Sequence, residues 1–165
     1  MSRDYLALAR RIRGALLDLE HVAQRAEQLC NKARQTGDDG YWDGVALNLH
    51  GFYEGVEQLL ETLAQAIEGS LPSGPQWHRD LLIQMSKEVP GARPAVIAED
   101  TFQCLENYRT FRHVVRNVYS FYLRPDRLQE LVNALQSCSE AVKHDLTRFA
   151  DFLEKSAQLE DPPLD

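Results

Sequence analysis

Hydrophobic residues recur at intervals of three and four along most of the chain, which is the pattern of amphipathic α-helices. Over about residues 2–36 the repeat consists of Leu6, Ala9, Leu16, Leu19, Ala23, Ala26, Leu29 and Ala33. Over about 41–68 it consists of Leu49, Phe52, Val56, Leu59, Leu60, Leu63 and Ile67. Over about 126–156 it consists of Leu128, Leu131, Leu135, Val142, Leu146, Phe149 and Leu153. The alternation typical of β-strands does not occur in the sequence, so an all-α fold is predicted.

Clusters of glycine and proline divide these helical segments at residues 37–40, 69–75, 90–94 and 124–126. They leave a shorter helix at about 76–89 and a long one at about 94–123, with Pro94 in its first turn. Four long helices with short connections favour an antiparallel up-and-down bundle, with one short helix in addition. Residues 1–157 are expected to form a single domain, and residues 158–165 a flexible acidic tail.

The second helical segment contains Gly44, Gly51 and Gly55. Each glycine in a helix interior costs about 1 kcal/mol relative to alanine. Close approach of another helix or of a second subunit is the simplest compensation for that cost.

Basic residues are concentrated in one part of an acidic chain. The net charge is -7, which argues against broad, non-specific binding of nucleic acids. Between Glu106 and Asp126, however, there is no acidic residue. On a helix at about 100° per residue, one side of this stretch carries a cationic strip, defined here as Arg109, Arg112, His113 and Arg116. Asn117 lies on the same side, Tyr108 and Tyr119 at its border, and the opposite side is apolar.

The cationic strip has two interpretations. Guanidinium groups match the geometry of phosphate, histidine titrates near neutral pH, and tyrosine can stack on a base, so the strip suits a confined RNA site. Alternatively, its arginines pair with Glu54, Glu57 and Glu61, which line one side of the second helix.

The sequence gives little support to a metal site or to the common catalytic and nucleotide-binding motifs. A di-iron bundle needs Glu-x-x-His on two helices, and neither His50 with Glu54 nor Glu20 with His21 has that spacing, so no metal or cofactor is expected. The motifs of serine hydrolases, phosphate loops and dinucleotide sites do not occur. His21, His78 and His144 are expected at the surface, and Trp42 and Trp77 as packing anchors.

Three cysteines, Cys30, Cys104 and Cys138, show no paired spacing and are expected to be small buried hydrophobic residues. The chain opens directly into a charged amphipathic helix and contains no apolar run long enough to span a membrane. A reducing cytoplasm is therefore the expected compartment.

The segment Phe111-Arg-His-Val-Val-Arg-Asn-Val-Tyr119 resembles the HEPN superfamily, and specifically its HepT-like branch. Three further segments are similar to that branch in the same order: Leu49–Glu57, Pro75–Leu82 and Pro90–Pro94. The resemblance thus covers about residues 40–155. It implies an all-helical domain of a superfamily that includes metal-independent ribonuclease toxins.

The family motif is an arginine, four intervening residues, a histidine, one further residue and a tyrosine. Placed on this chain, Arg112 is the arginine, His113 the polar residue after it, and Tyr119 the tyrosine, but Asn117 stands at the histidine position. The resemblance implies catalysis by Arg112, Asn117 and His113, and phosphate or RNA binding by Arg109, Arg116 and Tyr119. Because asparagine does not titrate, the loss of a general acid–base there typically costs about 10²- to 10⁴-fold in rate.

The resemblance also implies partners. Family members act on RNA at a homodimer cleft and are usually paired with a minimal nucleotidyltransferase antitoxin. That antitoxin is expected to transfer AMP onto Tyr119, with Tyr122 as the adjacent alternative. Two alternatives stay open: a catalytically inactive HEPN-type module that dimerises and binds a nucleotide or nucleotidyltransferase partner, and a structural bundle whose cationic strip is paired internally.

Overall fold

The computed structural model describes the backbone of residues 2–117 and 123–160, and the side chains of residues 3–112 and 123–160. The described residues form five helices: α1 (Ser2–Thr36), α2 (Gly40–Glu68), α3 (Trp77–Met85), α4 (Glu99–Asn117) and α5 (Pro125–Glu160). No β-strand occurs within the described residues, where the only β-type pairing is an isolated bridge between Val89 and Arg93. The prediction of an all-α bundle with four long helices and one short helix is confirmed.

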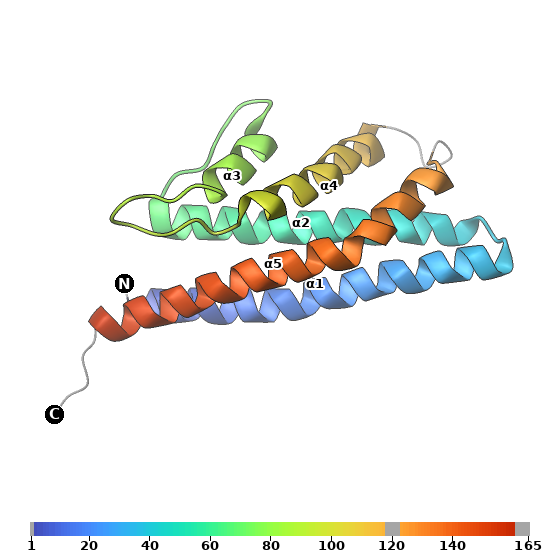
Figure 1. Ribbon diagram of the computed structural model, residues 1–165. Coiled ribbons are helices and arrows are strands. Elements are labelled where there is room, and N and C mark those ends of the chain that lie inside the picture. The colour runs from blue at the N-terminus through green and yellow to red at the C-terminus, as the bar shows by residue number, and fades with distance from the viewer. Residues whose placement is uncertain (1, 118–122, 161–165) are drawn as a thin grey trace.

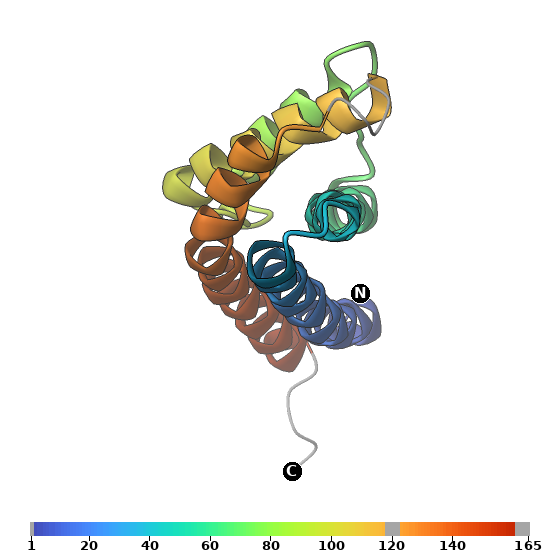
Figure 2. The same cartoon turned by 90° about the vertical axis from the view of Figure 1, so that its right-hand side faces the viewer.

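The four long helices form an antiparallel up-and-down bundle (Figure 1). Helix α1 packs most extensively against α5 on one side and α2 on the other. Helix α4 closes the arrangement by packing on both α2 and α5, and the short α3 lies against α2 and α4. The end-on view shows α3 and α4 together as one layer above α2 (Figure 2).

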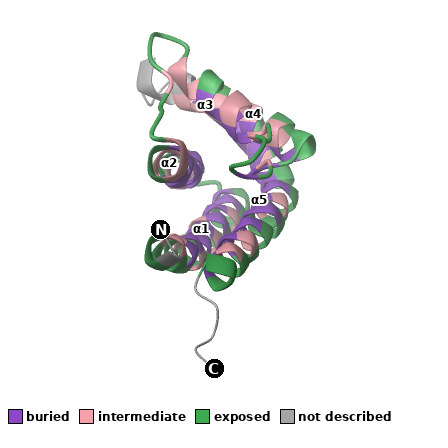
Figure 3. Ribbon diagram, turned by 90° about the vertical axis from the view of Figure 1, so that its left-hand side faces the viewer, coloured by how far each residue is buried: buried purple, intermediate pink, exposed green. Residues whose placement is uncertain are grey.

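The apolar stripes predicted from the sequence face the interior (Figure 3), except for Leu6 near the start of α1, which is exposed. Residues of every long helix are fully buried, among them Ile12, Leu49, Phe52, Leu105 and Phe149. Burial of such side chains contributes about 1.5–3 kcal/mol each, which makes this interior the main source of stability.

The glycines of α2 allow close packing of α1 within the same chain. A Cβ atom on Gly44 would lie 2.9 Å from Leu29 Cδ1, and one on Gly55 would lie 2.8 Å from Leu19 Cδ2. The prediction of a close helix contact is confirmed for these two positions. Since the contacting helix is α1, these glycines give no support to a dimer.

Helix α4 begins later than predicted, at Glu99 and not near Pro94. Val96 and Ile97 are fully buried, and their backbone N–H groups donate to the carbonyl of Met85 at the end of α3. Buried Asp145 of α5 then accepts hydrogen bonds from the backbone N–H of Ala98 at 2.8 Å and from the Thr101 hydroxyl at 2.5 Å. This carboxylate therefore ties the residue before α4 and the first turn of α4 to α5.

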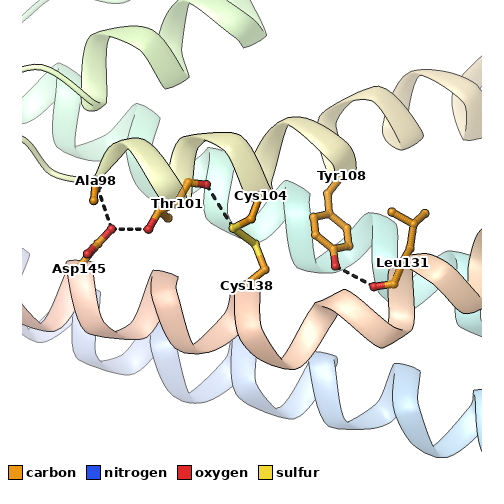
Figure 4. The surroundings of a disulfide bond; sticks show 7 residues. All are labelled: Ala98, Thr101, Cys104, Tyr108, Leu131, Cys138 and Asp145. Atoms are coloured by element: carbon orange, nitrogen blue, oxygen red, sulfur yellow. Dashed lines mark hydrogen bonds between the residues drawn. A yellow bond between two sulfur atoms is a disulfide. The ribbon is translucent and has the colours of Figure 1, made fainter.

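Two of the three cysteines are paired. A disulfide joins Cys104 of α4 to Cys138 of α5, with their Cα atoms 5.7 Å apart (Figure 4). The expectation of three unpaired hydrophobic cysteines is therefore wrong for this pair, because helix packing brings together residues whose spacing in sequence gives no such signal. Cys30 is free and buried as expected. Its thiol donates to Gln129 Oε1 at 3.3 Å, and burial raises its pKa.

The other boundaries differ less from the predictions. Helix α3 spans nine residues and ends four residues before the expected Val89. Helix α5 continues through Glu160, so the expected flexible tail is helical over residues 158–160, while residues 161–165 lie outside the described part. None of the described helices combines the length and apolarity that crossing a membrane requires.

Candidate functional site

Three residues from three helices form a polar network beside the core. Glu57 of α2 is buried, with 3% of its surface exposed. Its Oε2 lies 2.8 Å from Nδ1 of His78 in the first turn of α3. The other ring nitrogen of His78, Nε2, lies 3.4 Å from Nη1 of Arg112 on α4. The network therefore runs from a buried carboxylate through an imidazole to a guanidinium.

Packing fixes the imidazole in this position. The Trp77 ring lies against His78 with 3.6 Å between ring centroids. Trp77 itself packs on the hydrophobic core, as predicted for a packing anchor. Glu57 is held because α2 is buried on the side that also contains Tyr53, Val56 and Leu60.

The chemistry of the partners determines the protonation of the imidazole in this arrangement. Arginine has only donors, so the contact with Arg112 requires an unprotonated Nε2 on His78. The remaining ring proton then sits on Nδ1 and is donated to the Glu57 carboxylate.

Arg112 keeps unused hydrogen-bonding capacity. Its Nη1 contacts His78, and its Nε is buried without a hydrogen-bond partner among the described residues. No carboxylate of the described residues forms an ion pair with Arg112, so the expected pairing with glutamates of α2 is indirect, through His78. Because no carboxylate of the described residues neutralises it directly, this guanidinium is suited to an anionic ligand.

Neighbouring groups shape the electrostatics of the network. The hydroxyl of fully buried Tyr53 also has no partner among the described residues. Burial, together with the charge of Glu57, raises the pKa of the Tyr53 phenol, which keeps it neutral. Burial and the nearby Glu57 carboxylate also raise the pKa of Glu61, which the positive charge of Arg112 partly opposes.

The cationic strip is only partly an open surface. Arg109 lies half-buried and donates to both carboxylate oxygens of Glu106, at 2.7 and 2.9 Å, so its charge is paired within α4. Those hydrogen bonds raise the pKa of Arg109. Tyr108, predicted at the border of the strip, is buried and donates to the carbonyl of Leu131.

The remaining predicted site residues cannot be placed in this network. His113, Arg116 and Asn117 belong to α4, but their side chains lie outside the described part of the chain. Tyr119 and Tyr122 also lie outside the described residues. Their assigned roles remain predictions.

His78 is the residue that sequence reasoning misplaced. It was expected at the surface without a partner, but its side chain is only 22% exposed and is bound to Glu57. The sequence does indicate that Glu57 needs a polar partner, because Glu57 is an acidic residue on the apolar side of α2. His21 and His144 are exposed as expected.

Other features of the surface do not converge on this network. A pocket of about 270 Å³ lies between α4 and the start of α5 and is lined by Phe111, Leu123, Arg124 and Arg127 among others. It does not include Arg112 or His78. Among the described residues no cluster of three or more histidine, cysteine or acidic side chains is arranged to hold a metal ion.

Comparison with known protein families identifies the family to which this chain belongs. A family model described as HepT-like protein matches residues 44–153, two thirds of the chain. The matched range contains Glu57, His78 and Arg112, and extends from the first turns of α2 well into α5. No curated protein and no solved structure matches the chain. An all-helical bundle with this family match assigns the chain to the HepT-like family, as a domain of the HEPN type.

Proposed function

We propose that this protein is a metal-independent endoribonuclease of the HepT-like toxin type, with Arg112 binding the scissile phosphate. One observation carries the proposal: the arginine at the family's motif position has an unpartnered Nε and forms no ion pair with a carboxylate of the described residues. Family membership supports the class of reaction.

In the proposed reaction a ribose 2′-hydroxyl attacks its own phosphate. The transition state gathers negative charge on the phosphoryl oxygens, and a guanidinium already in place stabilises that charge without reorganisation. Arg116, Arg109 and Tyr119 would contact flanking parts of the RNA, with Arg109 contributing least because Glu106 already pairs with it. Asn117 would hold the phosphate by hydrogen bonds. His113, which directly follows Arg112, is the titratable residue of the motif.

The assembly and its regulation are part of the same proposal. Two copies would bring their α4 helices to one cleft, and a nucleotidyltransferase encoded in a neighbouring reading frame would inhibit the toxin by transferring AMP to Tyr119. The proposed place of action is the cytoplasm. Solution mass measured by light scattering tests the homodimer, and co-purification with the neighbouring gene product tests the nucleotidyltransferase partner.

Induced expression in bacterial cells tests the function. Wild type is expected to stop growth and degrade RNA, and Arg112→Ala is expected to do neither at equal protein level. Arg25→Ala, which removes an exposed arginine of α1, is the matched control and should behave as wild type. Growth and intact RNA in cells that contain folded wild-type protein would end the enzyme proposal.

The presence of Asn117 favours a second candidate, an inactive HEPN-type module that dimerises and binds a nucleotide or a nucleotidyltransferase partner. Asn117→His separates the two candidates. If the module has lost only its motif histidine, the variant gains RNA cleavage over an inert wild type. If wild type already cleaves RNA, the second candidate is excluded.

A further inference from the structure

We infer that His78, oriented by Glu57, takes the proton from the attacking 2′-hydroxyl, in place of the histidine that the family motif puts where this chain has Asn117. The inference rests on the proposed ribonuclease function and names a residue outside the motif. It makes His78 a catalytic residue and Glu57 a positioning residue.

The geometry of His78 fits a general base. Its Nε2 carries a lone pair and lies 3.4 Å from Nη1 of Arg112, so a phosphate bound to Arg112 would bring its ribose hydroxyl close to that nitrogen. Its Nδ1 donates to a carboxylate 2.8 Å away. A carboxylate behind an imidazole fixes the tautomer and stabilises the imidazolium that proton transfer creates.

The surroundings separate this role from a purely structural one. While Nδ1 contacts Glu57, the second ring nitrogen is directed at the guanidinium of Arg112, which forms no ion pair with a carboxylate of the described residues. The His78 side chain is 22% exposed, which leaves it open to a ligand. Trp77, in close contact with the ring, limits its rotation.

The charges acting on the imidazole come from two helices besides its own. Glu57 and Glu61 of α2 are the negatively charged groups near the ring, and Arg112 of α4 is the positively charged one. A phosphate bound to Arg112 would offset part of the positive charge beside the ring.

The bonds and protons of the proposed step balance. Nε2 of His78 takes the proton of the 2′-hydroxyl, and the 2′-oxygen forms a bond to phosphorus. The bond from phosphorus to the 5′-oxygen breaks, and the 5′-oxygen leaves with a proton from water. The imidazolium then returns its proton to solvent, which leaves a 2′,3′-cyclic phosphate and a 5′-hydroxyl.

The first test measures cleavage of a short single-stranded RNA by purified protein across pH 5–9. His78→Gln is expected to lower kcat by about 10²- to 10⁴-fold, the range for loss of a general base. Wild type is expected to lose rate toward acidic pH, and this loss should be absent from the residual activity of the variant. His21→Gln, at an exposed position on α1, is the matched control and should leave both rate and profile unchanged.

Glu57→Gln keeps the imidazole and tests the positioning role. Its expected effects are a smaller loss of kcat and a displacement of the acidic limb toward lower pH, since the imidazolium loses the carboxylate that stabilises it. Far-ultraviolet circular dichroism and thermal unfolding establish that each variant is folded. An unchanged pH profile in Glu57→Gln would overturn the role given to Glu57.

The second test does not depend on RNA. Long-range ¹H–¹⁵N NMR correlations of the histidine rings report the tautomer, and His78 is expected to carry its proton on Nδ1. A ring protonated on Nε2 at neutral pH would overturn the inference, even if His78→Gln were unfolded.

The outcomes distinguish this inference from the proposed function. If wild type cleaves RNA, Arg112→Ala does not, and folded His78→Gln is as active as wild type, only the role of His78 is lost. If Arg112→Ala cleaves as fast as wild type, or wild type does not cleave, the proposed function is lost and the inference with it.

Discussion

At the scale of single residues, Arg112 and His78 show what a sequence pattern can and cannot reveal. Arg112 could be selected from the sequence because it lies in a run without acidic residues, on one side of a helix. The sequence indicates that Glu57 needs a polar partner but does not identify His78 as that partner, because Glu57 and Arg112 lie 21 and 34 residues from His78 along the chain. Contacts of that kind depend on how helices pack, and periodicity within one helix does not report on them.

Asp145 gives a prediction about stability. Substitution Asp145→Ala removes the acceptor for the Ala98 N–H and leaves the hydroxyl of buried Thr101 without its partner. The free energy of unfolding is expected to fall by about 1–3 kcal/mol, the usual cost of an unsatisfied buried group. Urea denaturation followed by circular dichroism measures the change.

Asp151→Ala is the matched control on the same helix. Asp151 forms an exposed ion pair with Arg13, and such pairs contribute at most about 1 kcal/mol. Equal effects of the two substitutions would contradict the role assigned to Asp145 at the start of α4.

At the scale of helices, the boundaries that follow from local chemistry were predicted well and those that depend on packing were not. The first helix has the predicted limits, Ser2–Thr36, because Gly37 and the residues after it end it locally. The start of α4 was placed five residues too early, since the preceding segment is held by Met85 and Asp145, which belong to other helices.

The glycines of α2 allow a comparison within one helix. A Cβ atom on Gly51 would meet Val22 Cγ1 at an ordinary 3.8 Å, whereas one on Gly55 would lie 2.8 Å from Leu19 Cδ2. Gly51→Ala is expected to raise the free energy of unfolding by about 0.5–1 kcal/mol through helix propensity. Gly55→Ala should gain less or lose stability, because Leu19 must move. Thermal and urea unfolding of both variants measure the difference, and a larger gain for Gly55→Ala would contradict the packing of α1 on α2.

The disulfide between α4 and α5 gives a third prediction. It joins residues 34 positions apart, and the chain-entropy model assigns such a cross-link about 3–4 kcal/mol. Reduction or Cys138→Ser should therefore lower the urea midpoint markedly, whereas Cys30→Ser in the oxidised protein should leave the disulfide contribution intact. Alkylation and mass spectrometry count the free thiols, and three free thiols in protein purified without reductant would contradict the pairing.

At the scale of the whole molecule, the bundle determines which part of the cationic strip is available. Antiparallel packing places α4 against both α2 and α5, with its Thr101, Cys104 and Tyr108 directed at α5 (Figure 4). Arg112 lies one turn beyond Tyr108, where α3 has joined the bundle and supplies His78. The fold class, the family and the motif arginine followed from the sequence, whereas the three-helix network required the packed molecule.

The most direct measurement of the central claim is the rate at which purified protein cleaves single-stranded RNA in the presence of EDTA. Wild type is expected to produce fragments with 2′,3′-cyclic phosphate ends, and Arg112→Ala should lose at least about 10²-fold in rate, as when a transition-state donor is removed. Arg25→Ala should match wild type. Equal rates for wild type and Arg112→Ala, or cleavage that stops when EDTA is added, would contradict a metal-independent site built on Arg112.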